Sequence, residues 1–209
     1  MSVEVIRSET PFRGRAFAVR QDRVRLPDGR EMTVDLVDHP GSVTLIPVDQ
    51  QGRLLLVRQY RHPAGEDLLE LPAGTLDAGE DPPTCAVREC REEIGMAPGR
   101  LTPLATCYLA PGYSSELMVW YLAEDLSPAP LSPDQDEDLE IVRLTQRECL
   151  DMIQAQTLRD AKSVLGILLA VASGRPGVLA GRSPRRAAPL GLPRERGRPA
   201  ATKRRKASA

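Results

Sequence analysis

The sequence of 209 residues is poor in the side chains on which many binding and catalytic sites depend. Aromatic residues make up only 3% of the chain, and its two histidines are His39 and His62. So few histidines exclude a zinc site of the HExxH type and leave few candidates for a Ser-His-Asp triad. If the protein is an enzyme, its chemistry must rest on carboxylates, thiols or metal ions.

Disulfide pairs and long hydrophobic runs are also missing. The four cysteines, Cys85, Cys90, Cys107 and Cys149, form no CxxC pair. A chain of this length does not need disulfides to be stable, so reduced and mostly buried thiols are expected. There is no run of 18 apolar residues, and the first ten residues lack the basic start and apolar stretch of a secretory signal. These absences favour a cytoplasmic protein with no membrane partner.

Charge is nearly balanced over the whole chain but not along it. The formal net charge is -1, from 28 Lys and Arg against 29 Asp and Glu. Segment 173–209 contains 11 basic residues and one acidic residue, so the first 172 residues carry a net charge of -11 and the tail carries +10. The tail has no apolar period and no aromatic residue, so we expect it to be disordered. The first 172 residues suffice for one domain with a core, or a domain plus a small appendage.

Strands and helices alternate in groups along the first 172 residues. The predicted strands cover residues 15–25, 31–37, 42–48, 54–59, 68–71, 101–110, 117–123 and 139–144. The predicted helices cover residues 82–94, 146–154 and 160–172. The turn sequence Pro27-Asp28-Gly29 joins the first two strands into a hairpin. The order strands, helix, strands, helices is typical of an α+β or mixed α/β fold.

The helix predicted at 82–94 carries several carboxylates. Proline near its start and Gly95 just after its end are the usual signals of helix boundaries. At about 100° per residue, four residues form a stripe that can face the core: Pro83, Val87, Cys90 and Ile94. Glu89 and Glu93 then project roughly opposite this stripe, with Glu92 to one side. Three carboxylates therefore share one helical surface.

This crowding has two interpretations. Like charges one turn apart destabilise a helix by about 0.2–0.5 kcal/mol, and near the C-terminal end they also oppose the helix dipole. A hard divalent cation such as Mg²⁺ or Mn²⁺ would remove both penalties, because it prefers carboxylate oxygen. The alternative is a solvated acidic face, with Arg88 and Arg91 forming weak surface pairs. The glycine-containing loop upstream favours the metal site, because it would let backbone carbonyls approach the same ion.

Residues 74–96 resemble the Nudix box, Gly-x5-Glu-x7-Arg-Glu-(apolar)-x-Glu-Glu-x-Gly-(apolar). All fixed positions match: Gly74, Glu80, Arg88, Glu89, Cys90, Glu92, Glu93, Gly95 and Met96. Cys90 is a mild departure, and cysteine acts there as a small hydrophobic residue. The resemblance implies an α/β/α sandwich, in which the box forms a loop, a helix and a loop. It also implies an enzyme that hydrolyses a nucleoside diphosphate linked to another group.

The same resemblance assigns roles within the box. Glu89 and Glu93 would ligate Mg²⁺, or alternatively Mn²⁺, and the carbonyl of Ala73 would complete the shell. Glu92 would act in catalysis, as a further ligand or through a water molecule. Arg88 would orient the glutamates through charge-assisted hydrogen bonds rather than touch substrate.

The resemblance to the box also implies a role for Glu80 and a role for the bound ions. Glu80 is expected to be a structural anchor of the loop. The bound ions would neutralise the pyrophosphate, bridge its oxygens and lower the pKa of the attacking water.

Beyond the box, nearly all of residues 1–172 resemble the ADP-ribose pyrophosphatase branch of this family. Three features carry the resemblance: the strand pair Leu56-Val-Arg-Gln-Tyr-Arg61 and Glu70-Leu-Pro-Ala-Gly74, the proline at Pro111, and the segments 136–142 and 160–164. The implied reaction is Mg²⁺-dependent hydrolysis of ADP-ribose to AMP and ribose 5-phosphate. The implied organisation is an N-terminal β-region at 1–40, a Nudix domain at 41–172 and the tail at 173–209.

Three residues outside the box receive roles from this branch. Arg61 would contact a substrate phosphate, to which its fork of donors is suited, although it could equally be a surface arginine at a strand end. Glu70 would reach toward metal or substrate, or else pair with a buried arginine. Glu137 corresponds to the general base, with Asp136, Asp138 and Glu116 as competing candidates.

The resemblance also implies that the N-terminal region takes part in recognition of the base and in assembly. Phe17 and Phe12 are the aromatic residues available there to stack on adenine, with core packing as the alternative role. The extra N-terminal hairpin implies a homodimer with exchanged strands, because a long exposed sheet edge is a liability unless it is paired.

Other functions stay open at this point. The same chemistry could act on another nucleoside diphosphate sugar, such as GDP-mannose. A different possibility is a non-catalytic nucleotide-sensing module, against which the intact Glu89, Glu92 and Glu93 argue. The basic tail could contact nucleic acid without sequence specificity, although a solvated extension is the simpler interpretation.

Overall fold

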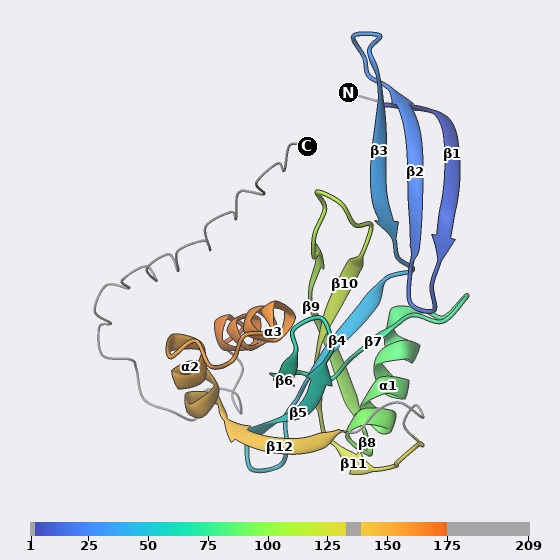
Figure 1. Cartoon of the computed structure of the whole chain (residues 1–209). Helices are drawn as coiled ribbons and strands as arrows, with labels where there is room; N and C mark the ends of the chain where they lie inside the picture. Colours follow the sequence, from blue (N-terminus) through green and yellow to red (C-terminus); the bar gives the residue numbers. More distant parts are fainter. Residues whose placement is uncertain (1–2, 133–138, 175–209) are drawn as a thin grey trace, which may run out of the picture.

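The computed structural model describes residues 3–132 and 139–174 (Figure 1). These residues form a mixed α/β structure of short sheets and three helices. The predicted general base Glu137 and nearly all of the basic tail lie outside the described residues, so the expected disorder of the tail stays a prediction. No helix in the described ranges is long and apolar enough to cross a lipid bilayer.

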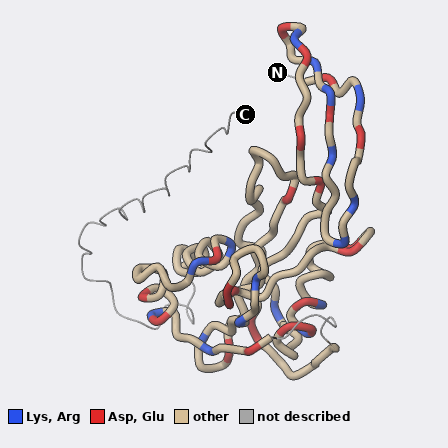
Figure 2. Tube along the Cα trace, viewed as in Figure 1, with Lys and Arg blue, Asp and Glu red and all other residues tan. Residues whose placement is uncertain are grey.

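The N-terminal region is an antiparallel sheet that projects from the body (Figure 1). Its strands, in spatial order, are β1 (Glu4–Arg13), β2 (Ala18–Arg25) and β3 (Glu31–Asp38). The hairpin predicted from the sequence is confirmed, and Gly29 adopts φ 84° in its turn. Strand β1 was not predicted, because almost all of its residues are exposed and show no alternating burial. Acidic and basic residues are interspersed along β1 and β2, whereas the charged residues of β3 are all acidic (Figure 2).

Two sheets form the body. The four-stranded sheet, in the order β7-β4-β10-β9, contains β4 (Ser42–Pro47), β7 (Ala73–Thr75), β9 (Arg100–Tyr108) and β10 (Leu117–Glu124). The three-stranded sheet, in the order β12-β5-β6, contains β5 (Arg53–Arg61), β6 (Glu66–Glu70) and β12 (Glu140–Thr145). A further short pair joins β8 (Met96–Ala97) to β11 (Ser127–Pro128). Strands β7, β8 and β11 were not predicted, because two or three residues are too short to show a period.

Helices cover both faces of this body. The three predicted helices are confirmed as α1 (Pro82–Glu93), α2 (Gln146–Gln154) and α3 (Ala161–Ala172). One buried cluster, which includes Leu56 and Trp120, packs under α2 and α3, whereas another, which includes Leu55, packs under α1. Leu55 and Leu56 belong to different clusters because successive side chains of β5 point to opposite faces. The predicted α/β/α sandwich is therefore confirmed (Figure 1).

A glycine in α3 sets how closely that helix approaches the sheet. A Cβ atom at Gly166 would lie 2.6 Å from Cδ1 of Leu71 and 3.0 Å from Cδ1 of Trp120. The indole Nε1 of Trp120 donates a hydrogen bond of 3.0 Å to the carbonyl of Lys162. These contacts fix the first turn of α3 against the chain that leads into β7.

Candidate active site

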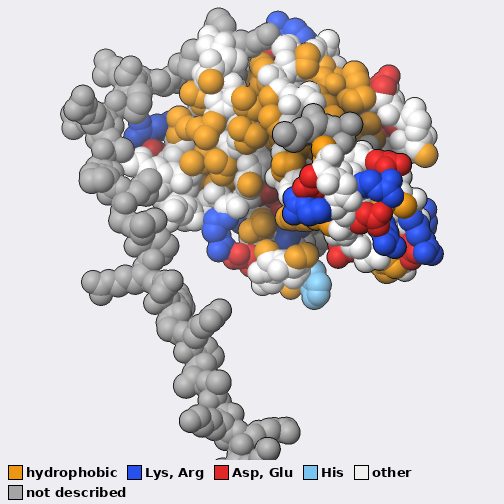
Figure 3. Space-filling view, turned by 90° about the horizontal axis from the view of Figure 1, so that it is seen from above, with side chains coloured by type: hydrophobic (Ala, Val, Ile, Leu, Met, Phe, Trp, Pro, Cys, Tyr) orange, Lys and Arg blue, Asp and Glu red, His pale blue; other side chains and the backbone are white. Residues whose placement is uncertain are grey.

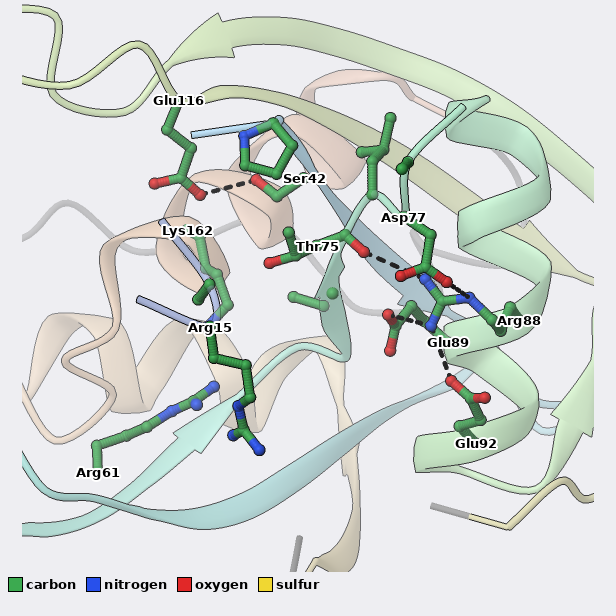
Figure 4. Close-up of a pocket in the computed structure, with 16 residues that line it drawn as sticks. Arg15, Ser42, Arg61, Thr75, Asp77, Arg88, Glu89, Glu92, Glu116 and Lys162 are labelled. Carbon is green, nitrogen blue, oxygen red and sulfur yellow. Dashed lines mark hydrogen bonds and ion pairs between the residues drawn. The ribbon is translucent and has the colours of Figure 1, made fainter. Parts of the chain in front are cut away.

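A cavity of about 730 Å³ lies where α1, β5, β7 and α3 meet the loop between β1 and β2 (Figure 4). Its charged side chains gather on two sides. Arg88, Glu89 and Glu92 line one side, and together with Glu80 and Glu93 of the same box we call them the acidic wall. We call Arg15, Arg61 and Lys162 the basic wall. At the rim between them, Ser42 Oγ donates a hydrogen bond of 2.8 Å to Glu116.

Helix α1 begins and ends as its sequence predicts. Asp81 caps its N-terminus by accepting a 2.8 Å hydrogen bond from the backbone N–H of Thr84, and Gly95 follows the helix with φ 68°. The predicted orientation was wrong in part, because Pro83 is exposed and Val87 only half-buried. The buried residues are Cys85, Ala86, Glu89, Cys90 and Glu93. The prediction set Glu89 and Glu93 opposite the stripe that faces the core, whereas both are buried against strand β7, Glu89 at Gly74 and Glu93 at Ala73.

The closest approach between α1 and β7 occurs at Gly74. A Cβ atom on Gly74 would lie 1.8 Å from Oε1 of Glu89, a distance at which no side chain could coexist with the carboxylate. Glu89 itself is only 8% exposed. Glycine is therefore required here because the carboxylate occupies the space of a side chain, and this explains the first position of the box.

Arg88 connects the acidic residues to one another. Its Nη1 donates to Glu89 at 2.7 Å and to Glu92 at 2.9 Å. Its Nε and Nη2 donate to the two oxygens of Glu80 at 3.0 and 2.9 Å. The predicted orienting role of Arg88 agrees with these bonds, and the surrounding carboxylates raise its pKa.

Glu80 fastens the loop before α1. Hydrogen bonds from Arg88, which have the largest effect, lower the pKa of Glu80 from 4.5 to about 2. Glu80 also accepts a 3.0 Å hydrogen bond from the backbone N–H of Asp77. Glu80 is thus ionised under all ordinary conditions and holds the loop to Arg88, as the anchoring role requires.

The oxygen atoms around β7 fit a divalent cation. One oxygen of Glu93, a residue only 6% exposed, accepts a 3.0 Å hydrogen bond from the backbone N–H of Ala73. Across the described residues, no three His, Cys, Asp or Glu side chains converge on one point, since Arg88 draws Glu89 and Glu92 to itself. Even so, Glu93, Glu89 and the Ala73–Gly74 backbone offer the hard oxygen donors that such a cation prefers.

The basic wall is organised around one buried carboxylate. Arg61 donates two 2.8 Å hydrogen bonds to the two oxygens of Glu70, which is 2% exposed. Lys162 also donates to Glu70 and makes a 2.8 Å bond to Asp160. Burial alone would raise the pKa of Glu70, but the hydrogen bonds from Arg61 and the charge of Lys162 outweigh it and lower that pKa.

The family is decided by comparison with known proteins. The model of the NUDIX domain matches residues 38–164. The chain belongs to the Nudix family. A Bacillus subtilis (strain 168) protein named ADP-ribose pyrophosphatase is 32% identical over 166 residues, which cover 78% of this chain and 90% of that protein. A Mycobacterium tuberculosis (strain ATCC 25618 / H37Rv) protein of the same name is 45% identical over 124 residues, 59% of this chain and 60% of that protein.

A solved structure agrees with this assignment. The crystal structure of an ADP compounds hydrolase aligns with a TM-score of 0.72 and 26% identity, over 83% of this chain and 94% of that one. The chain is therefore a Nudix hydrolase similar to ADP-ribose pyrophosphatases, as its sequence predicts. Divalent-metal dependence is general among Nudix hydrolases, and the donors around β7 are of the kind that such dependence requires.

Four of the eight predicted site residues line one cavity, and two more, Glu70 and Glu93, are buried and bonded to residues that line it. Glu89, Glu92 and Arg61 line it, and Ala73 lies between them on β7. Phe17 follows the pocket-lining Ala16, is 42% exposed, and contacts Phe12 with a ring-centroid distance of 6.5 Å. The roles of these residues toward metal and substrate stay predictions, as does the role of Glu137, which lies outside the described residues.

Two cations of the basic wall were not assigned a role from the sequence. Arg15 lies in the loop between β1 and β2, where a basic residue in an exposed hairpin gives no distinctive signal. Lys162 is the third residue of Asp160-Ala-Lys-Ser-Val164, a segment whose resemblance to the family was noticed without a role for its lysine. Only the fold brings Lys162 next to Glu70, 92 residues earlier in the chain.

Proposed function

We propose that the chain is a Mg²⁺-dependent pyrophosphatase that hydrolyses ADP-ribose to AMP and ribose 5-phosphate. The observation that carries this proposal is the division of one cavity into an acidic and a basic wall. A pyrophosphate with its metal ion is the ligand that needs both, because the metal requires oxygen donors and the phosphates require cations. The names of the relatives described above support ADP-ribose as the substrate.

When bound, a divalent cation would neutralise the pyrophosphate and lower the pKa of an attacking water. Glu89, Glu93 and the carbonyl of Ala73 would hold it, and Mn²⁺ could replace Mg²⁺ because both prefer oxygen donors. Glu92 would add a charge next to this ion or accept a proton through water, while Arg88 keeps Glu89 and Glu92 in place. Glu93 is buried and accepts a hydrogen bond from the backbone N–H of Ala73, so its carboxylate lies beside the residue whose carbonyl would complete the shell.

The basic wall would bind the substrate. In our proposal Arg61 contacts a phosphate, because its Nη1 is not used in the two bonds to Glu70. Glu70 holds Arg61 in that orientation, which favours its role as the partner of an arginine over direct contact with substrate. Phe17 would stack on the base, and Glu137 would take the proton from the attacking water.

GDP-mannose is the second candidate substrate. A protein named GDP-mannose pyrophosphatase from Yersinia pestis (strain Pestoides F) is 31% identical over 134 residues, 60% of this chain and 67% of that protein. The chemistry at the metal would be the same, so only the residues that recognise base and sugar distinguish the two substrates. We place the residues that recognise the base in the N-terminal region, where Phe17 and Phe12 lie.

Assembly as a homodimer belongs to the same proposal. The N-terminal sheet exposes large apolar side chains, including Val5, Phe12 and Met32, and its outermost strand β1 offers an edge of ten residues. The face of the molecule drawn in Figure 3 also carries a broad field of hydrophobic side chains. Apolar surface of this extent is typical of protein interfaces. Cytoplasmic location and nucleic-acid contact through the tail stay predictions of the sequence.

A panel assay tests the proposed function. The purified chain is incubated with Mg²⁺ and, separately, ADP-ribose or GDP-mannose, and the nucleotide released is separated by chromatography. We expect AMP from ADP-ribose at the higher rate and no AMP from the Glu93→Gln variant. Release of GMP alone would favour the second candidate, whereas turnover of neither substrate would contradict both.

A further inference from the structure

The chain that leads from β6 into β7 is held at three successive residues. The N–H of Leu71 donates a 2.6 Å hydrogen bond to Oγ of Ser163. The carbonyl of Pro72 accepts a 2.8 Å bond from the N–H of Leu45, and the N–H of Ala73 donates to Glu93 at 3.0 Å. Two of these anchors come from the sheet and from the proposed metal site. The anchor at Ser163 comes from α3, on the opposite side of the sheet.

The hydroxyl of Ser163 is held in a single orientation. Ser163 is completely buried, and its Oγ donates to Asp160, the residue that caps α3. Because its one hydrogen points to Asp160, a lone pair is left to accept the hydrogen bond from Leu71. Asp160 also accepts a 3.0 Å bond from the N–H of Ser163, so the cap and the hydroxyl support each other. Pro72 has no N–H, which makes the Leu71 bond the last backbone donor contact before Ala73.

The same turn of α3 also reaches the basic wall. Lys162, the residue before Ser163, is bonded to Asp160 and to Glu70, the residue before Leu71. Glu70 in turn accepts hydrogen bonds from Nε and Nη2 of Arg61. One helical turn therefore contacts two adjacent residues between β6 and β7. Ser163 bonds to the backbone N–H of Leu71, and Lys162 bonds to the carboxylate of Glu70.

We propose that the first turn of α3 is a positioning device for both walls of the cavity. Ser163 fixes the backbone that presents the carbonyl of Ala73 to the metal ion, and Lys162 fixes Glu70 and, through it, Arg61. Ser163 does not line the cavity, and Lys162, which does, acts in this proposal through its bond to Glu70. The inference rests on the proposed function for its metal and substrate, and it adds a support that lies outside the residues of the box.

Metal binding without substrate tests the Ser163 part. Mn²⁺ is titrated into the full chain, and the free ion is followed by electron paramagnetic resonance. Ser163→Ala leaves the N–H of Leu71 without a buried partner, and we expect the Mn²⁺ dissociation constant to rise roughly tenfold, as for other supports of metal ligands. Ser163→Thr keeps the hydroxyl and should restore binding. Ile167→Val, in the same helix and fully buried, removes a methylene without touching the hydroxyl and serves as the matched control.

For Lys162 the proposal predicts a change in substrate binding and no change in metal binding. Lys162→Met should raise KM for ADP-ribose several-fold through the loosened Glu70 and Arg61, with the Mn²⁺ dissociation constant unchanged. In Ser163→Ala, kcat should recover at high Mg²⁺ while KM for ADP-ribose stays at the wild-type value. A general loss of stability would not separate metal binding from KM in this way.

Three outcomes would overturn the proposal. They are wild-type Mn²⁺ binding by Ser163→Ala, an equal loss of Mn²⁺ binding in Ile167→Val, and an unchanged KM in Lys162→Met. If Ser163→Ala does not unfold cooperatively on heating, Ser163→Cys takes its place, because sulfur has a similar size but is a weak acceptor. Failure of the proposed function is a separate result: wild-type protein that hydrolyses no nucleoside diphosphate sugar would remove the substrate but leave the Mn²⁺ comparison decisive for Ser163.

Discussion

The two walls of the cavity are built on opposite plans. In the acidic wall one arginine, Arg88, bonds to three glutamates, Glu80, Glu89 and Glu92. In the basic wall one glutamate, Glu70, bonds to two cations, Arg61 and Lys162. Each wall thus keeps an excess of its own charge, while one central side chain of opposite charge, Arg88 or Glu70, holds its members in place. The difference explains how carboxylates and cations can line the same cavity while each group is held within its own wall, as the proposed metal and phosphate sites require.

The walls also differ in how the chain assembles them. All residues of the acidic wall lie within 23 positions of the box, on one loop and one helix, so α1 alone fixes most of their geometry. The basic wall joins the end of β5, the end of β6 and the start of α3, and adds Arg15 from the N-terminal sheet. Its geometry depends on the whole fold, and in particular on the close approach of α3 at Gly166.

Breaking the acidic wall at its glycine should have the largest effect. In Gly74→Ala the new Cβ would lie 1.8 Å from Oε1 of Glu89, so the carboxylate must move away from β7. Displacement of a metal ligand should lower kcat/KM roughly a hundred-fold, because support of metal ligands is worth about ten- to a hundred-fold each. Steady-state kinetics with ADP-ribose and Mg²⁺ measure the change. Gly112→Ala is the control, since a Cβ there meets nothing within 4 Å, and equal activity of the two variants would contradict the account.

Weakening the basic wall should have a smaller effect of a different kind. Arg61→Lys keeps the charge but loses the planar fork that bonds to Glu70 and faces the cavity. We expect KM for ADP-ribose to rise about tenfold, the value of roughly 1.4 kcal/mol of lost binding, with kcat changed less. Arg58→Lys, on the same strand but paired at the surface with Glu140, should behave as wild type. A fall in kcat at unchanged KM would instead mean that Arg61 acts in the chemical step, with the metal site, and not in substrate binding.

The ionised carboxylate of Glu80, which anchors the acidic wall, should make the stability of the protein depend on pH. Bonding to Arg88 lowers the pKa of Glu80 from 4.5 to about 2, so this stabilisation is complete above pH 4.5 and is lost as the pH falls toward 2. Glu80→Gln should therefore melt a few degrees below wild type at neutral pH, and the difference should shrink on acidification. Thermal melts across this range measure it, with Glu140→Gln as the control. A difference independent of pH would mean that Glu80 acts through packing alone.

What could be predicted from the sequence follows the same division between local and distant contacts. The box gave Glu89, Glu93, Arg88 and the anchor Glu80, because their spacing on one helix is a local property. Strands with alternating or buried runs, such as β4 and β5, were equally accessible. The side of α1 that faces the core was predicted only in part. Cys90 and Ile94 are buried as expected, but the burial of Glu89 and Glu93 reverses the usual rule that charged side chains face water.

The remaining features depend on contacts that no local pattern encodes. Strand β1 is exposed on nearly all of its residues and is defined only by its pairing with β2. Lys162 and Ser163 look like ordinary residues of a helix start until the fold brings them to Glu70 and Leu71. The general base stays a choice among loop acids, since Glu137 lies outside the described residues.

The central claim is that the acidic wall binds the metal ion and the basic wall binds the phosphate. It is tested most directly by titrating Mn²⁺ into wild type, Glu93→Gln and Arg61→Lys without substrate. The free ion is followed by electron paramagnetic resonance. The account predicts that Glu93→Gln loses Mn²⁺ binding over the range in which wild type saturates, and that Arg61→Lys binds as wild type does. Mn²⁺ binding that survives in Glu93→Gln, or that falls equally in both variants, would contradict the assignment of the metal to the acidic wall and of the phosphate to the basic wall.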